Sequence, residues 1–137
     1  MSTEQKPLDT QHYRILVVED ERLVRDALEF ILKGQGHQVT SAESGEKALE
    51  AFAEAEHDIA LVDLGLPGRN GYDVAQELKR RKPGMPVLLV TGWGGDIDRD
   101  RARRIGVDGV VNKPYEPQEL LRAICAAAEA AKRRKGS

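Results

Sequence analysis

Short apolar runs, each ended by a polar or charged residue, constrain the fold of this 137-residue chain more than any other feature. The runs cover residues 15–18, 38–42, 59–62, 87–90 and 107–111. Such short runs, rich in β-branched residues, predict strands buried on both faces of a sheet. Glu19 and Asp63 directly follow the first and third runs, Thr91 follows the fourth, and Lys113 comes two residues after the fifth. We therefore expect five strands with chemically reactive groups at their ends.

Between these runs, apolar residues recur at helical spacing. The first predicted helix carries Leu23, Val24, Ala27, Leu28, Ile31 and Leu32 and ends near Gly34; the others cover 44–53, a segment carrying Val74, Ala75 and Leu78, then 96–105 and 117–131. Ser44 is placed to cap the second helix. Strands alternating with helices predict the α/β class: a doubly wound, five-stranded parallel sheet with helices on both faces. In such sheets the ligand site lies beyond the carboxyl ends of the strands.

Length and composition fit one ordinary globular domain. Charged residues make up 32% of the chain and the net charge is -2, which argues against a strongly basic nucleic-acid binder. No apolar run approaches the ~20 residues of a membrane helix. We expect residues 1–13 to form a flexible lead-in, 14–131 the domain, and 132–137 a basic frayed tail or linker stub.

The remaining polar residues are expected to have structural roles. The single cysteine, Cys125, excludes an internal disulfide, favours a reducing cytoplasmic setting and is expected in the core. His12, His37 and His57 share no metal-ligand spacing and are expected on the surface. The arginines of 99–104 are interrupted by acids, which favours a solvated helix face.

The strand ends suggest a specific chemistry. In a parallel sheet these ends share one edge, so Asp20, Asp63, Thr91 and Lys113 should converge although they are far apart in the sequence. Close carboxylates repel one another unless a cation joins them, and oxygen ligands suit Mg²⁺. A carboxylate beside Mg²⁺ can attack phosphorus, while an ammonium and a hydroxyl neutralise or hydrogen-bond the transferred oxygens. The expected product is an aspartyl phosphate.

Four segments at these strand ends, 17–21, 63–71, 90–92 and 112–115, resemble the receiver domain of two-component response regulators. The resemblance spans about residues 14 to 131. It implies a flavodoxin-like (βα)5 fold with strand order 2-1-3-4-5. It also implies a phosphoryl group taken from a histidine kinase or a histidine phosphotransfer protein, and an output made through contacts with a downstream protein. Neither nucleic acid nor membrane is an expected direct partner.

The resemblance further implies a role for each matching residue. Asp63 is the expected phosphoacceptor; Asp20 the direct Mg²⁺ ligand, with Glu19 acting through water and Gly65 through its backbone carbonyl; Thr91 and Lys113 the groups that contact the phosphoryl oxygens. The Lys113–Pro114 peptide is expected to be cis. The chain is expected to catalyse its own phosphorylation and dephosphorylation but not to turn over an independent substrate.

Three positions depart from the common receiver pattern. Val110 stands where many receivers have an aromatic residue that moves together with the threonine. Trp93 and Gly65 occupy the two positions that tune phosphoryl loss in similar domains. A large indole and a missing side chain there lead us to expect slow to moderate self-dephosphorylation.

Other interpretations remain open. The chain could be a module of a hybrid histidine kinase or of a longer regulator. A small Mg²⁺-dependent phosphohydrolase would need an acid two residues after its nucleophile, where this chain has Gly65. A flavodoxin-like cofactor binder would need a phosphate-cradling loop after the first strand, where this chain has the acids of 19–21. A degenerate receiver that serves only as an interaction surface is disfavoured by the intact set of site residues.

Overall fold

A computed structural model of the chain describes residues 11–66, 70–92 and 97–136. Its elements are β1 (Arg14–Val18), α1 (Arg22–Gly34), β2 (Gln38–Ala42), α2 (Gly45–Glu54), β3 (Ile59–Asp63), α3 (Gly71–Arg81), β4 (Val87–Thr91), α4 (Arg99–Ile105), β5 (Gly109–Asn112) and α5 (Pro117–Gly136). The strands are parallel and lie in the order β2-β1-β3-β4-β5. The predicted fold class and strand order are confirmed.

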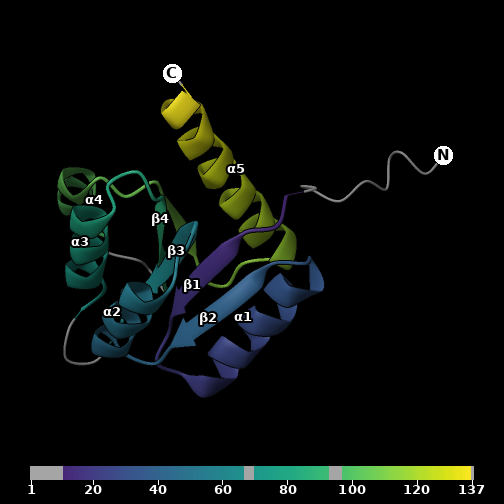
Figure 1. Cartoon of the computed structure of the whole chain (residues 1–137). Helices are drawn as coiled ribbons and strands as arrows, with labels where there is room; N and C mark the ends of the chain where they lie inside the picture. The colour runs from purple at the N-terminus through teal and green to yellow at the C-terminus, as the bar shows by residue number, and fades with distance from the viewer. Residues whose placement is uncertain (1–10, 67–69, 93–96, 137) are drawn as a thin grey trace.

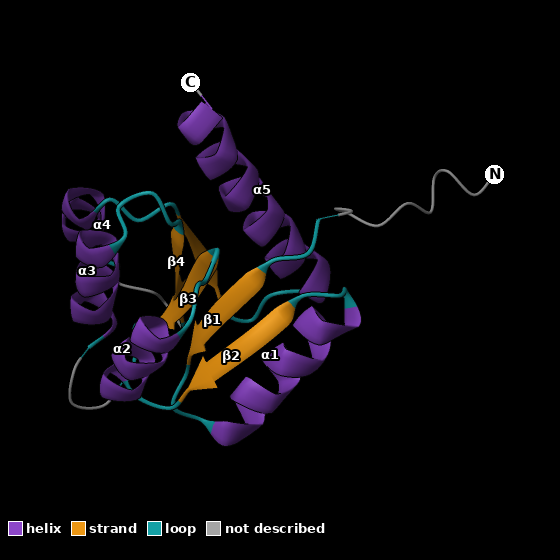
Figure 2. Ribbon diagram, viewed as in Figure 1, coloured by secondary structure: helices purple, strands orange, loops and turns teal. Residues whose placement is uncertain are grey.

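Helices cover both faces of the sheet, as Figures 1 and 2 show. Alternate residues of each strand point to opposite faces, so the core is divided in two. Ile15 and Val17 of β1 pack with residues of α1 and α5, whereas Leu16 and Val18 pack with residues of α2, α3 and α4. Burial on both faces explains why the central strands are continuous apolar runs.

The first helix buries a narrower stripe than its sequence suggests. Leu28 and Leu32 are buried, but Leu23, predicted on the apolar face, is 81% exposed, and Ala27 is exposed as well. Leu23 lies five residues before Leu28, which places it about 140° around a helix of 3.6 residues per turn. The helical spacing of these six apolar residues therefore does not place all of them on the buried face.

The fifth strand begins two residues later than predicted, because the preceding residues complete other structures. Gly106 ends α4 in the left-handed conformation at φ 88°, and the Val107 amide donates to the Ala102 carbonyl. The Asp108 carboxylate accepts a hydrogen bond from the Val87 amide at 2.8 Å. The start of α4 also differs: Asp98 caps it and the helix begins at Arg99, while residue 96 lies outside the described residues.

The last helix continues through Gly136, past the predicted end at Ala131. Two contacts hold the segment that the sequence predicted as a frayed tail. Lys132 Nζ lies 5.0 Å from the centre of the Tyr13 ring, and Arg134 Nη2 lies 3.3 Å from Asp108 Oδ1. Cationic residues in the last turns also suit the negative end of the helix dipole.

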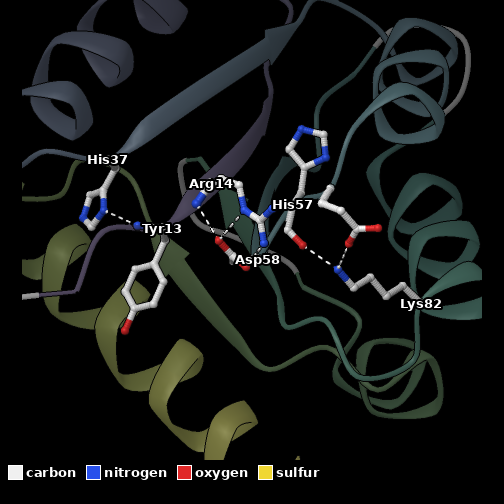
Figure 3. A network of polar contacts seen from close by, with 7 residues as sticks. Tyr13, Arg14, His37, His57, Asp58 and Lys82 are labelled. Atoms are coloured by element: carbon white, nitrogen blue, oxygen red, sulfur yellow. Dashed lines mark hydrogen bonds and ion pairs between the residues drawn. The ribbon is translucent and has the colours of Figure 1, made fainter.

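The amino-terminal edge of the sheet carries a network of polar contacts (Figure 3). His37 Nδ1 accepts a hydrogen bond from the Tyr13 amide at 3.0 Å, and the two rings stack. His57 is 2% exposed, and its ring stacks on Phe52. His37 and His57 are thus buried, which corrects their predicted surface location, whereas His12 is exposed. Ring stacking and the use of an imidazole as an acceptor leave no periodic pattern in a sequence.

The burial of His57 predicts a pH dependence of stability. Burial, with the nearby Lys82 and Arg14, lowers the pKa of His57. The folded state therefore prefers the neutral ring, so its stabilisation is complete above the ordinary pKa of about 6.5 and is lost as the pH falls through the lowered folded-state pKa. In urea titrations, the free energy of unfolding of His57→Phe should rise relative to that of the wild type as the pH falls from 7 to 5. Above pH 7 the difference between the two proteins should be constant. Parallel stability curves from pH 7 to pH 5 would contradict this.

Candidate functional site

Backbone hydrogen bonds extend the sheet one residue past several strand ends and position the groups predicted to form the site. The Glu19 amide donates to the Ala42 carbonyl at 3.0 Å, and the Lys113 amide donates to the Thr91 carbonyl at 2.7 Å. The Leu64 amide, next to Asp63, donates to the Val90 carbonyl at 2.9 Å. The first residues after β1, β3 and β5 are therefore held as firmly as strand residues.

Three carboxylates meet at this edge. One oxygen each from Glu19, Asp20 and Asp63 lies within 4.8 Å of the others. Lys113 Nζ lies 3.0 Å from Asp63 Oδ2 and 3.3 Å from Glu19 Oε1. Glu19 is 2% exposed and Asp63 8%, so their charges are largely removed from water. The ammonium is thus shared between two buried acids that come from different strands.

The pKa values of the two buried acids, Glu19 and Asp63, are shifted in opposite directions. Burial and, to a smaller extent, the neighbouring Asp63 together raise the pKa of Glu19 to about 7. Burial also opposes ionisation of Asp63, but contacts with Glu19, the Gly65 amide and Lys113 outweigh it and hold the pKa of Asp63 below its ordinary value. Burial likewise opposes the charge of Lys113, but its two carboxylate partners keep its pKa raised. Asp63 is therefore the ionised member of the pair near neutral pH.

An open cleft of about 550 Å³ lies over these groups. Its lining includes Asp20, Asp63, Gly65, Thr91 and Lys113, so the structure brings these predicted residues together. Asp63 Oδ1 accepts a hydrogen bond from the Gly65 amide at 2.7 Å. The cleft can thus offer anionic oxygens, a hydroxyl and an ammonium to one small ligand.

The donor set fits Mg²⁺. This ion prefers oxygen ligands, keeps several waters and is commonly held by one or two carboxylates. Asp20 and Asp63 offer carboxylate oxygens to the open cleft, and Gly65, which also lines it, offers a backbone carbonyl. Glu19 is more enclosed and is bonded to Lys113 and to the Glu21 amide, consistent with its predicted role through water.

The structure also describes the positions predicted to switch or tune the site, with the exception of Trp93. The Lys113–Pro114 peptide is cis, as expected. Val110 is 39% exposed on the edge strand β5. Trp93 lies outside the described residues. The roles predicted for these positions and for Thr91 and Gly65 remain predictions.

Sequence reasoning missed two residues that shape the site. Tyr72 lines the cleft, and its hydroxyl accepts a hydrogen bond from the Asp98 amide at 2.7 Å. Gly71 packs so closely that a Cβ atom there would lie 2.4 Å from the Asp63 carbonyl oxygen and 2.7 Å from Leu64 Cα. A glycine directly before a helical pattern can signal close backbone packing, and this signal could have identified Gly71.

The family model for the response regulator receiver domain matches residues 15–125. This match covers all five strands apart from Arg14 at the start of β1, and every residue placed at the cleft. The chain belongs to the response regulator receiver family. Receivers act in two-component signal transduction and phosphorelays, and they bind Mg²⁺ at an acidic pocket.

Solved receiver structures share the fold. A CheY-like receiver domain protein from Methanospirillum hungatei JF-1 is 26% identical, with a TM-score of 0.85 over 90% of this chain and 99% of that chain. A receiver domain protein from Clostridium thermocellum is 32% identical, with a TM-score of 0.81 over 87% and 96% of the two chains. NtrX from Brucella abortus, solved with ATP, is 28% identical with a TM-score of 0.87; the match covers 92% of this receiver but only 29% of NtrX.

No helix in the described part of the receiver combines the length and apolarity that crossing a membrane requires.

We predict that repulsion between the carboxylates at the cleft lowers the free energy of unfolding of the receiver. Asp63→Asn should raise the free energy of unfolding by about 1 kcal/mol at pH 8 without divalent cations, because it removes like-charge repulsion while Lys113 keeps Glu19 as its partner. Urea unfolding measures the change. The gain should shrink at pH 6, where Glu19, with its pKa of about 7, is protonated.

Asp58→Asn is the matched control, since Asp58 is an acid with a single cationic partner. Its carboxylate accepts hydrogen bonds from the Arg14 guanidinium at 2.9 and 3.1 Å. This substitution should destabilise the receiver by up to about 1 kcal/mol. Equal effects of the two substitutions would show that crowding at the cleft is not the cause.

Close packing at the start of α3 gives a further prediction. Gly71→Ala should lower the free energy of unfolding by about 2 kcal/mol or more, because the added methyl group meets backbone atoms that cannot move independently of Asp63. Gly34→Ala is the control, since no atom lies within 4 Å of its added methyl group. Urea unfolding should show Gly34→Ala neutral or stabilising, and equal losses at both positions would contradict the packing argument.

Proposed function

We propose that this receiver takes a phosphoryl group from a phosphohistidine onto Asp63 and thereby changes its contacts with a downstream protein. The carrying observation is the ammonium of Lys113, 3.0 Å from a buried Asp63 carboxylate at the floor of an open acidic cleft. The donor would be a histidine kinase or a histidine phosphotransfer protein. The single cysteine is consistent with the cytoplasm as the proposed setting.

The proposed transfer uses the groups around the cleft. An Asp63 carboxylate oxygen attacks phosphorus, the phosphorus–nitrogen bond of the phosphohistidine breaks, and its electron pair returns to the imidazole. Lys113 and the Thr91 hydroxyl contact the phosphoryl oxygens as they move, which stabilises their charge. Mg²⁺ held by Asp20, Asp63 and the Gly65 carbonyl, with Glu19 acting through water, would supply further charge neutralisation.

The proposed return step is hydrolysis. A water oxygen attacks phosphorus, the bond to Asp63 breaks, inorganic phosphate leaves and the free carboxylate is restored. Gly65 offers no side chain to orient that water, which supports the expectation of slow to moderate self-dephosphorylation. It also offers no general acid for a leaving alcohol, so turnover of small phosphomonoesters is not part of the proposal.

The proposed output is a shift between conformations that a protein partner distinguishes. The comparisons include both a short receiver chain and the longer NtrX, so a free-standing regulator and a module of a longer protein both fit the proposal.

Intact-mass measurement after incubation with a small acyl-phosphate donor tests the proposal. The wild type should gain one phosphoryl group only when Mg²⁺ is present, because charge neutralisation at the cleft needs the cation. Asp63→Asn should gain none, whereas Asp58→Asn at the opposite edge of the sheet should behave as wild type. A phosphoryl group on Asp63→Asn would refute the assignment, and decay of the wild-type adduct within seconds would refute slow hydrolysis.

A further inference from the structure

We propose that Arg25 is a positioning residue that holds the Asp20 carboxylate in place for Mg²⁺. Arg25 lies in α1, outside the cleft lining, and its guanidinium reaches back to the loop that follows β1. Arg25 Nη1 lies 3.0 Å from the Glu19 carbonyl oxygen and 2.9 Å from the Asp20 carbonyl oxygen, and it donates a hydrogen bond to each. This inference rests on the proposed Mg²⁺ site and adds a residue that contacts neither the ion nor the phosphoryl group.

The three carboxylates of the site are not equally restrained. Asp63 accepts hydrogen bonds from the Gly65 amide and Lys113, and Glu19 accepts them from Lys113 and the Glu21 amide. The Asp20 carboxylate, in contrast, accepts no hydrogen bond from any described residue, and it is more exposed than the other two. Its position therefore depends on the backbone that carries it.

Arg25 donates the hydrogen bond that holds the backbone of Asp20 itself. The last hydrogen bond between this segment and the sheet is made by the Glu19 amide. Glu21, the cap residue of α1, makes no side-chain capping bond, so the start of the helix does not fix the loop in that way. The Glu21 amide donates to Glu19 Oε2 at 3.1 Å and the Arg25 amide donates to the Glu21 carbonyl at 2.9 Å, but neither bond involves Asp20. The two bonds from the Arg25 guanidinium join the carbonyls of Glu19 and Asp20 to α1 and so hold the residue that carries the ligand. Partners that orient metal ligands typically change metal affinity by 10- to 100-fold when removed.

The charge of Arg25 has the opposite expected effect, so the two contributions can be separated. A cation near the cleft repels Mg²⁺, and its removal by electrostatics alone would tighten binding. Loss of the two hydrogen bonds should weaken binding. Arg22, one turn earlier in α1, provides the matched control, because it is 82% exposed and pairs only with Asp26 at 3.7 Å among the described residues.

Calorimetric titration of the unphosphorylated receiver with MgCl₂ at fixed ionic strength tests the inference. Arg25→Gln should raise the dissociation constant about tenfold. Arg22→Gln should stay at the wild-type value or bind slightly more tightly. Arg25→Lys, which keeps the charge and a shorter donor, should recover part of the loss. Urea unfolding without Mg²⁺ should show that Arg25→Gln retains a cooperative transition.

The possible outcomes test the role of Arg25 separately from the proposed Mg²⁺ site. Wild-type or tighter Mg²⁺ binding by Arg25→Gln, or equal weakening by Arg25→Gln and Arg22→Gln, would overturn the role of Arg25 while leaving the proposed function intact. If Arg25→Gln does not fold, Arg25→Lys is compared with Arg22→Lys, and equal affinities of those two overturn the inference. Absence of saturable Mg²⁺ binding by the wild type would overturn both this inference and the proposed metal site.

Discussion

The ammonium of Lys113 makes the arrangement at the carboxyl edge of the sheet possible. It lies within 3.3 Å of carboxylate oxygens from both Glu19 and Asp63, two acids that are almost fully buried. Without a cation between them, both acids could not remain ionised at this separation. With one ammonium for two acids, Asp63 stays ionised while Glu19 has a pKa of about 7. The group proposed to act as the nucleophile is thus the one that keeps its charge.

This interaction depends on the parallel topology. Glu19 follows β1, Asp63 ends β3 and Lys113 follows β5, and 94 residues separate Glu19 from Lys113. The order β2-β1-β3-β4-β5 places β1, β3 and β4 side by side, with β5 next to β4. The backbone bonds one residue beyond the strands then fix where each side chain starts. The apolar packing of the two core layers therefore sets the distances at the cleft, although none of Glu19, Asp63 and Lys113 belongs to either core.

Patterns that reflect burial could be read from the sequence. The five strands and the convergence of Asp20, Asp63, Thr91 and Lys113 follow from short apolar runs with polar ends, whereas the strand order was implied only by the resemblance to receiver domains. Contacts made by a single long or aromatic side chain could not be predicted from the sequence. The stacking of His57 on Phe52 and the reach of Arg25 to backbone carbonyls belong to this kind. The exposure of Leu23 was missed for a related reason, since spacing shows that residues share a face but not how much of that face the sheet covers.

Charged side chains are paired differently at the two edges of the sheet. At the amino-terminal edge, acids and bases are matched: Arg14 pairs with Asp58, Lys82 with Glu56, and Lys79 with Asp108. At the carboxyl edge the ammonium of Lys113 contacts both Glu19 and Asp63, and the Asp20 carboxylate has no cationic partner among the described residues, so these acids are not matched one to one. A divalent cation carries the charge that restores the balance, and its binding would favour the ionised form of Glu19. Stability alone would favour matched pairs here too, so the unmatched acids support the proposed Mg²⁺ site in the cleft.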